Sequence, residues 1–218
     1  MNSIRPYGYK EKYHVTRKRR PKKIRTEVMI FCEGETELNY FKMLQQKYNG
    51  SGIKLKLRNE NGQKGNKLVN EAIVWRNAQG NGFSGSIYVC FDDDSQDKDS
   101  LVTALQTANH HHINVIFSKI NVEVWLLRHF RPIETTEKWL EKTWLYQRLT
   151  ETLQLKKRYE SYKGQDIAYK YEDYVQDAAT NCAAFFGETA LDSSVFYTNR
   201  PFTNFNHSIR DIFSIDTL

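Results

Sequence analysis

EVMIFCEGETELNYF, residues 27–41, changes from an apolar run to an acidic one within a few residues. Residues 28–32 have the length and composition of a short buried strand, and the stretch 36–48 has apolar residues at the spacing of an amphipathic helix. Glu33 directly follows the strand, and Glu37 lies in the first turn of the helix. Because a strand that passes at once into a helix begins an α/β unit, this stretch predicts the fold class.

The same alternation continues along the chain. IKLKL at 53–57, SIYVCF at 86–91 and INVIFS at 113–118 are predicted strands, and predicted helices separate them within 62–80 and 99–111. Strands and helices that alternate at this spacing form a parallel sheet with helices on both faces. The predicted fold class is therefore α/β, with a Rossmann-like parallel sheet flanked by helices and a helix-rich C-terminal part.

We expect three parts in the chain. Residues 1–25 form a basic arm with too little apolar surface to fold alone, and residues 26–130 form the α/β core. Residues 131–218 form an extension, dense in Trp, Tyr, Lys and Arg, that packs on the core. Helical spacing is predicted through this extension as far as Phe186.

The arm carries the positive charge of the chain. Its 25 residues contain ten Lys and Arg and one Glu, for a net charge of +9, whereas the other 193 residues have a net charge of −3. Such an arm suits electrostatic contact with phosphates, although a solubilising tail has the same composition. The predicted nucleic-acid contacts are Arg17, Lys18, Arg19, Arg20, Lys22 and Lys23.

Cysteine usage and hydropathy exclude several classes of protein. Cys32, Cys90 and Cys182 lie far apart and form no CxxC pair, which argues against a zinc site or a disulfide framework. No apolar run approaches the roughly 20 residues that span a bilayer, and the first residues lack the apolar segment of a secretory signal. We therefore expect a cytoplasmic protein without membrane segments.

Acidic residues follow two of the predicted strands. Glu33 follows the first strand, and Asp92 and Asp94 follow the third, in the segment FDDDS. The functional crevice of an open parallel sheet lies outside the carboxyl ends of its strands. If the two strands are neighbours, these carboxylates meet there, and Cys32 and Cys90 lie side by side. Like charges so close need a cation, and Mg²⁺ or Mn²⁺ suits oxygen ligands.

Each acidic cluster also has a simpler explanation. Glutamates are common in the first turn of a helix, and an Asp-rich segment after a strand is often a polar loop. The occurrence of both clusters at the same end of two buried strands favours a metal platform that contains Glu33, Asp92 and Asp94. Gly34 is expected to let the chain turn tightly into the helix.

EGETE after the first strand and DxD after the third resemble the two acidic motifs of the Toprim fold, which occurs in topoisomerases, bacterial primases, OLD-family nucleases and small defence nucleases. More closely, the ordered set CEGETELNYF, KGNKLVNEA, YVCFDDDS and SKINVEVWLLRHF resembles the RloB family of bacterial and archaeal proteins implicated in abortive infection. The similarity runs from about Arg17 to Phe213. It implies a Toprim-like core and a metal-dependent nuclease of DNA or RNA, with tRNA among the candidate substrates. It also implies a role in anti-phage defence and an ABC-type ATPase as partner chain.

By position, the resemblance implies six catalytic residues: Glu33, Glu37, Asp92, Asp94 and Glu123 in these motifs, and Lys163 in ESYKGQD, where the family tends to have a Tyr-x-Lys-like element. Glu33, Asp92 and Asp94 would hold the metal ion, which polarises a phosphoryl oxygen and activates water. Glu37 or Glu123 would accept a proton or position a second metal, and Lys163 would neutralise developing charge. Where the family commonly has SNPCFE, this chain has SKINVE, so the loop before Glu123 departs from the family pattern.

Two other functions remain open. A phosphatase of the haloacid dehalogenase type would use Asp92 as an aspartyl nucleophile, although its DxD motif normally follows the first strand of the domain. A non-catalytic nucleic-acid-binding regulator would depend on the arm and not on Asp92. No GxxxxGK[ST] motif is present, so any nucleotide hydrolysis would come from another chain.

Overall fold

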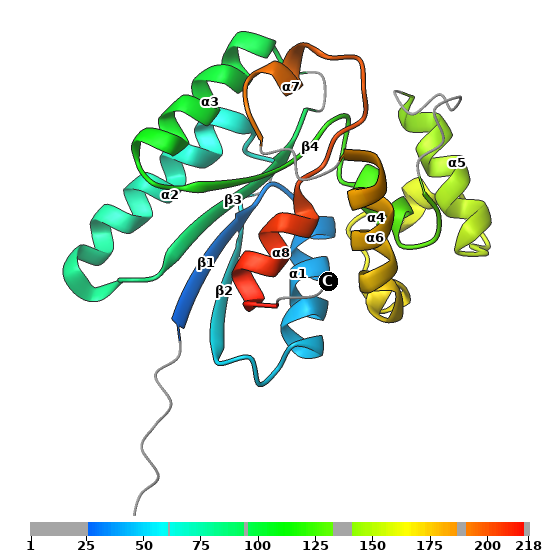
Figure 1. Cartoon of the computed structure of the whole chain (residues 1–218), viewed down its shortest axis with the longest axis horizontal. Helices are drawn as coiled ribbons and strands as arrows, with labels where there is room; N and C mark the ends of the chain where they lie inside the picture. The colour runs from blue at the N-terminus through cyan, green and yellow to red at the C-terminus, as the bar shows by residue number, and fades with distance from the viewer. Residues whose placement is uncertain (1–25, 61, 94–95, 133–140, 187–190, 216–218) are drawn as a thin grey trace, which may run out of the picture.

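The computed structural model describes residues 26–60, 62–93, 96–132, 141–186 and 191–215. Its centre is a four-stranded sheet of β1 (Thr26–Cys32), β2 (Ile53–Asn59), β3 (Ser86–Asp92) and β4 (Asn114–Ser118) (Figure 1). The strands pair in parallel in the order β2-β1-β3-β4. The predicted Rossmann-like α/β fold is confirmed, and β1 and β3, the two strands that end in acidic residues, form the middle of the sheet.

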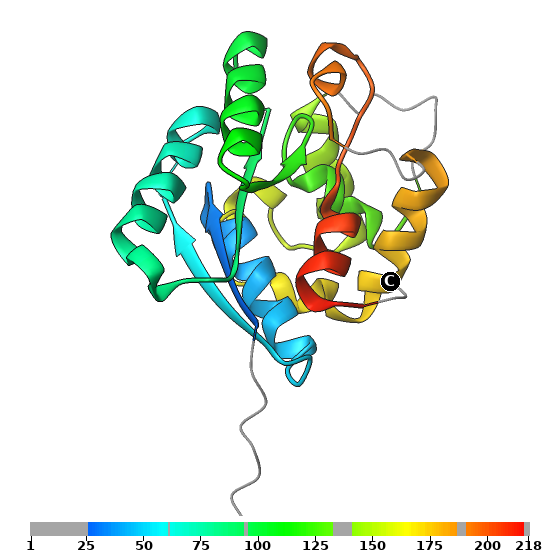
Figure 2. The same cartoon turned by 60° about the vertical axis from the view of Figure 1, so that its left-hand side comes forward.

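Helices cover both faces of the sheet (Figure 2). α2 (Gly65–Gln79) and α3 (Lys98–His110) lie on one face, and α1 (Glu35–Lys47) and α8 (Phe205–Phe213) lie on the other. Because successive residues of a strand point to opposite faces, Phe31 and Val89 pack with α2 and α3, whereas Ile30 and Cys90 pack with α1 and α8. Burial on both faces explains why β1 and β3 are apolar along most of their length, whereas the half-exposed β2 alternates apolar residues with lysines.

After β4 the chain continues through α4 (Glu123–Arg128), α5 (Lys142–Thr152), α6 (Val175–Phe186) and α7 (Ser194–Tyr197). Short 3₁₀-helices are η1 (Gly80–Gly82), η2 (Tyr159–Tyr162) and η3 (Ala168–Tyr174). α4, α5 and α6 contribute Trp125, Leu149 and Cys182 to the apolar cluster that also contains β1 and β3. The helical spacing predicted as far as Phe186 is not continuous, because 3₁₀ turns and irregular chain occupy the segment between α5 and α6. Within the described ranges, the helices are all too short or too polar to cross a membrane.

The register of β1 against β3 places Cys32 opposite Cys90. Both thiols are buried and free, and burial raises the pKa of each well above its usual value. The prediction that these cysteines lie side by side is confirmed. It follows that the residues after the two strands, Glu33 and the segment beginning at Asp92, leave the sheet at the same edge.

A C-terminal segment covers the outer edge of β4. Thr203 forms an antiparallel bridge with Ser118. The side chain of Asn204 accepts a hydrogen bond from the Phe117 amide (2.7 Å) and donates one to the Val115 carbonyl (2.8 Å). These contacts satisfy backbone groups that an edge strand would otherwise expose. They also fix the carboxyl end of β4, beside the acidic residue Asp92 at the end of β3.

Candidate active site

A cavity of about 390 Å³ lies at the carboxyl ends of β1 and β3. It is lined by Glu33 after β1, Glu37 in the first turn of α1 and Asp92 at the end of β3, together with Lys142 and Lys163 from the C-terminal part. This is the edge at which open parallel sheets bind their ligands. The structure thus brings acidic residues that are 59 positions apart in the sequence into one site.

Three of the carboxylates that line the cavity are buried, whereas that of Glu35 is exposed. Glu33, Glu37 and Asp92 are 9%, 6% and 9% exposed. The Asp92 backbone amide donates a hydrogen bond to Glu33 Oε2 (3.4 Å), which ties the two strand ends together. Asp92 Oδ1 has no hydrogen-bond partner within the described parts of the chain. A buried acceptor of this kind is suited to a cation or to a donor supplied by a ligand.

Burial makes the charged forms of these acids unfavourable. It raises the pKa of Glu33 and raises that of Glu37 to about 7. Burial, followed by repulsion from Glu33, Glu37 and Glu123, raises the pKa of Asp92 well above its usual value. A bound divalent cation would reverse this tendency, because it stabilises the ionised carboxylates.

Glu123 and Lys163 form an ion pair beside the cavity. Glu123, the first residue of α4, is 0% exposed, and its Oε1 lies 3.3 Å from Lys163 Nζ. Burial raises the pKa of Glu123, and Lys163 opposes this shift. Burial by itself lowers the pKa of Lys163, but Glu123 and the Tyr146 hydroxyl outweigh burial and raise the lysine pKa above its usual value. Lys163 Nζ also donates to that hydroxyl (3.1 Å), so the lysine is held in one orientation.

Two further lysines belong to the site and were not assigned to it from the sequence. Lys64 Nζ lies 3.8 Å from Glu33 Oε1. Lys142 begins α5 and lines the cavity, and burial lowers its pKa while the charge of Asp92 raises it. The sequence did not assign Lys142 to the site, because no local pattern shows that α5 begins beside the carboxyl end of the sheet.

The middle aspartate of FDDDS faces away from the cavity lining. Asp93 lies 3.7 Å from the ammonium group of Lys119, which is 6% exposed. Lys119 Nζ also donates to the carbonyl oxygens of Val195 (3.1 Å) and Phe196 (2.8 Å). Asp94 and the six predicted contacts in the basic arm (Arg17, Lys18, Arg19, Arg20, Lys22 and Lys23) lie outside the described residues.

Gly34 serves a different purpose from the one that its position suggested. Its φ of −143° and ψ of 179° are extended values that any residue adopts, so the turn into α1 does not need a glycine. A Cβ atom at this position would lie 3.2 Å from Glu37 Oε2. A glycine is therefore favoured here because it leaves space for the Glu37 carboxylate.

The side chains of the site are of the kind that binds a divalent cation, but the described residues provide fewer ligands than a complete coordination shell needs. Among the described residues, which exclude Asp94, no group of three or more His, Cys, Asp and Glu side chains is arranged to hold a metal ion. Glu33 and Asp92 nevertheless offer carboxylate oxygens at one edge, and Asp92 has an unpaired buried oxygen. Mg²⁺ commonly takes one or two protein carboxylates and fills its other positions with water and substrate phosphate.

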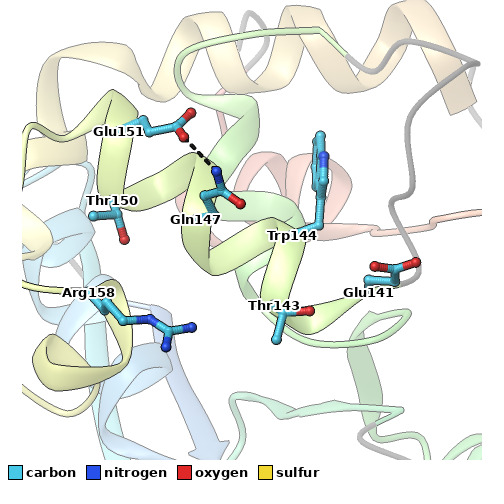
Figure 3. A pocket seen from close by; sticks show the side chains of 7 residues that line it. All are labelled: Glu141, Thr143, Trp144, Gln147, Thr150, Glu151 and Arg158. Atoms are coloured by element: carbon cyan, nitrogen blue, oxygen red, sulfur yellow. Dashed lines mark hydrogen bonds between the residues drawn. The ribbon is translucent and has the colours of Figure 1, made fainter.

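A second cavity, of about 570 Å³, lies along α5 (Figure 3). Figure 3 shows Trp144, Gln147 and Glu151 on the helix and Arg158 across from it, with Gln147 donating to Glu151 (2.9 Å). Glu151 and Arg158 are largely exposed, with side chains 49% and 77% accessible. Because its charged groups are solvated and do not converge, we take the cavity at the sheet edge as the candidate active site.

The chain was also compared with known proteins. The family model described as RloB-like protein matches residues 28–212. The matched range contains all six residues expected from the motifs, namely Glu33, Glu37, Asp92, Asp94, Glu123 and Lys163. No curated protein and no solved structure matches the chain.

Proposed function

The chain belongs to the RloB-like protein family, and from this premise we propose that it is a metal-dependent nuclease that hydrolyses phosphodiester bonds in DNA or RNA. The observation that carries the proposal is the convergence of Glu33, Glu37 and Asp92 with Lys142 and Lys163 in one cavity at the carboxyl edge of the sheet. Buried acids suit a divalent cation, and neighbouring ammonium groups suit a phosphate.

In this proposal Glu33, Asp92 and Asp94 hold Mg²⁺ or Mn²⁺. When bound, the ion would polarise a phosphoryl oxygen and lower the pKa of a water molecule. Glu37, which lines the same cavity, accepts the proton of the attacking water as a general base. Lys142 and Lys163 neutralise charge on the phosphate and on the leaving oxygen.

We further propose that the nuclease acts in anti-phage defence, in the cytoplasm, together with an ABC-type ATPase chain. The support for this role is the resemblance of the sequence motifs and the family membership. Since no GxxxxGK[ST] motif occurs in the chain, nucleotide hydrolysis would be the task of the partner.

The test is a cleavage assay with the full chain against single- and double-stranded DNA, single-stranded RNA and tRNA, with Mg²⁺, Mn²⁺ or EDTA. Asp92→Asn should reduce metal-dependent cleavage by about a hundredfold or more, since even residues behind a metal ligand contribute 10- to 100-fold. Asp211→Asn removes an exposed aspartate of α8 outside the cavity and serves as the matched control. Cleavage that persists in EDTA or survives Asp92→Asn would refute the proposal.

The same variants separate the two rival functions. A phosphatase would form an aspartyl-phosphate on Asp92 that can be trapped and identified by mass spectrometry. A binding regulator would tolerate Asp92→Asn but lose its activity when residues 1–25 are removed. The nuclease is expected to lose cleavage with the first change and mainly salt-sensitive affinity with the second.

A further inference from the structure

Asn121 has an unpaired buried oxygen at the candidate site. It lies between β4 and α4, is 1% exposed and lines the cavity of Glu33 and Asp92. Its Nδ2 donates to the Tyr146 hydroxyl (3.4 Å), and its Oδ1 has no hydrogen-bond partner among the described residues. Leaving an amide oxygen buried without a donor is costly, so this position calls for a ligand.

The missing partner must be electropositive. Asp92 Oδ1 is a second buried oxygen of the same cavity without a hydrogen bond in the described structure. A carboxylate oxygen and an amide oxygen are both acceptors. Two orphaned acceptors in one cavity require a donor or a cation and would repel an anion. Amide oxygens, like carboxylates, are ligands of hard divalent cations.

The backbone before Asn121 is strained in a way that fixes its position. Ile120 has a φ of 80°, in the left-handed region that β-branched residues rarely adopt. Lys119 holds one side of this turn, because its amide donates to the Phe202 carbonyl (2.8 Å). On the other side the Val124 amide donates to the Asn121 carbonyl (3.2 Å). Strain that the surroundings enforce in this way is concentrated at functional sites.

We propose, on the premise that the chain is a metal-dependent nuclease, that Asn121 is an additional oxygen ligand of the divalent cation held by Glu33 and Asp92. The Tyr146 hydroxyl orients the amide, since it accepts from Nδ2 and leaves Oδ1 for the ion. Asn121 then supplies a protein oxygen in addition to those of Glu33 and Asp92, from the same cavity lining.

The test measures metal binding without nucleic acid or catalysis. Isothermal titration of the full chain with MnCl₂ compares wild type, Asn121→Ala, Asn121→Asp and Asp92→Asn. Asn121→Ala should weaken Mn²⁺ binding by about tenfold or more, and Asn121→Asp should bind at least as tightly as wild type, because a carboxylate replaces the amide oxygen. Asn206→Ala is the matched control. Asn206 is 3% exposed and also has an unpaired Oδ1, but it is absent from the cavity lining.

The outcomes distinguish this inference from the proposed function. Mn²⁺ binding that needs Asp92 but is unchanged in Asn121→Ala would overturn the inference and leave the metal site in place. Equal losses in Asn121→Ala and Asn206→Ala would assign the effect to packing and overturn it as well. Weaker binding by Asn121→Asp would mean that the amide nitrogen and not Oδ1 faces the cavity, and it would overturn the inference too. Failure of the wild type to bind Mn²⁺ would overturn the metal dependence of the proposed function together with the inference.

Discussion

Replacing Lys163 by Met removes the cation that the structure pairs with the buried Glu123 carboxylate. Glu123 is 0% exposed and lies 3.3 Å from the lysine, so the change leaves a carboxylate that water cannot reach directly. We expect Lys163→Met to destabilise the fold and Glu123→Gln to cost less. In Glu123→Gln the lysine left without its partner can be hydrated, since 42% of its side chain is exposed.

The size of the effect follows from these exposures. Breaking a buried ion pair by removing one partner costs about 3–5 kcal/mol. Because 42% of the lysine side chain is exposed, solvent screens the pair, and we expect about 2 kcal/mol for Lys163→Met and about 1 kcal/mol for Glu123→Gln. For a chain of this length, 2 kcal/mol lowers the melting temperature by about 4–8 °C. The double variant should cost about as much as Glu123→Gln alone, because no buried charge is left unpaired.

The assay is urea unfolding at pH 7.5 in EDTA, followed by far-UV circular dichroism, for the wild type, both single variants and the double variant. Repeating it at pH 5 tests the cause. Since burial raises the pKa of Glu123, the glutamate left alone is protonated as the pH falls, and the cost of Lys163→Met should shrink. The reasoning is refuted if the two single costs add to the double one within about 0.5 kcal/mol, the margin for independent sites.

Three more outcomes are expected. Asp92→Asn should raise the melting temperature of the metal-free protein, because burial and like charges raise the pKa of that aspartate. The variant should also lose the further rise in melting temperature that Mn²⁺ causes in the wild type. A thermal-shift titration with Mn²⁺ measures both effects. Burial lowers the pKa of His129 to about 3 from its usual 6.5, so its contribution is intact above about pH 6.5 and is lost as the pH falls towards 3. Relative to His129→Gln, the free energy of unfolding of the wild type in urea should fall by about 2 kcal/mol between pH 7.5 and 5. Parallel plots of this free energy against pH for the two proteins would contradict the prediction. Gly34→Ala places a Cβ 3.2 Å from Glu37 Oε2, so it should lower metal-dependent cleavage while the circular dichroism spectrum stays unchanged. The control is Gly82→Ala, whose Cβ meets nothing within 4 Å and which should change neither cleavage nor the spectrum.

The sequence alone determined the architecture, because the alternation of strand and helix is set by local side-chain periodicity. Short runs of five and six residues, mostly apolar, predicted β1 and β3 as buried strands, and the acidic residues at their ends predicted which end of the sheet carries the candidate site. The pairing of Cys32 with Cys90 confirmed that the two strands are neighbours. The interrupted helical region between α5 and α6 was missed, since 3₁₀ turns have no strong periodicity of their own.

Only the tertiary structure decided which residues from distant segments complete the site. Lys64 and Lys142 reach the acidic edge because α2 and α5 begin beside it. Asn121 is brought there by a strained turn at Ile120, whose left-handed backbone no sequence propensity favours in a β-branched residue. Such positions depend on how separate elements pack against one another. Local pattern carries no information about that packing, because each element's periodicity specifies which face is buried but not which partner buries it.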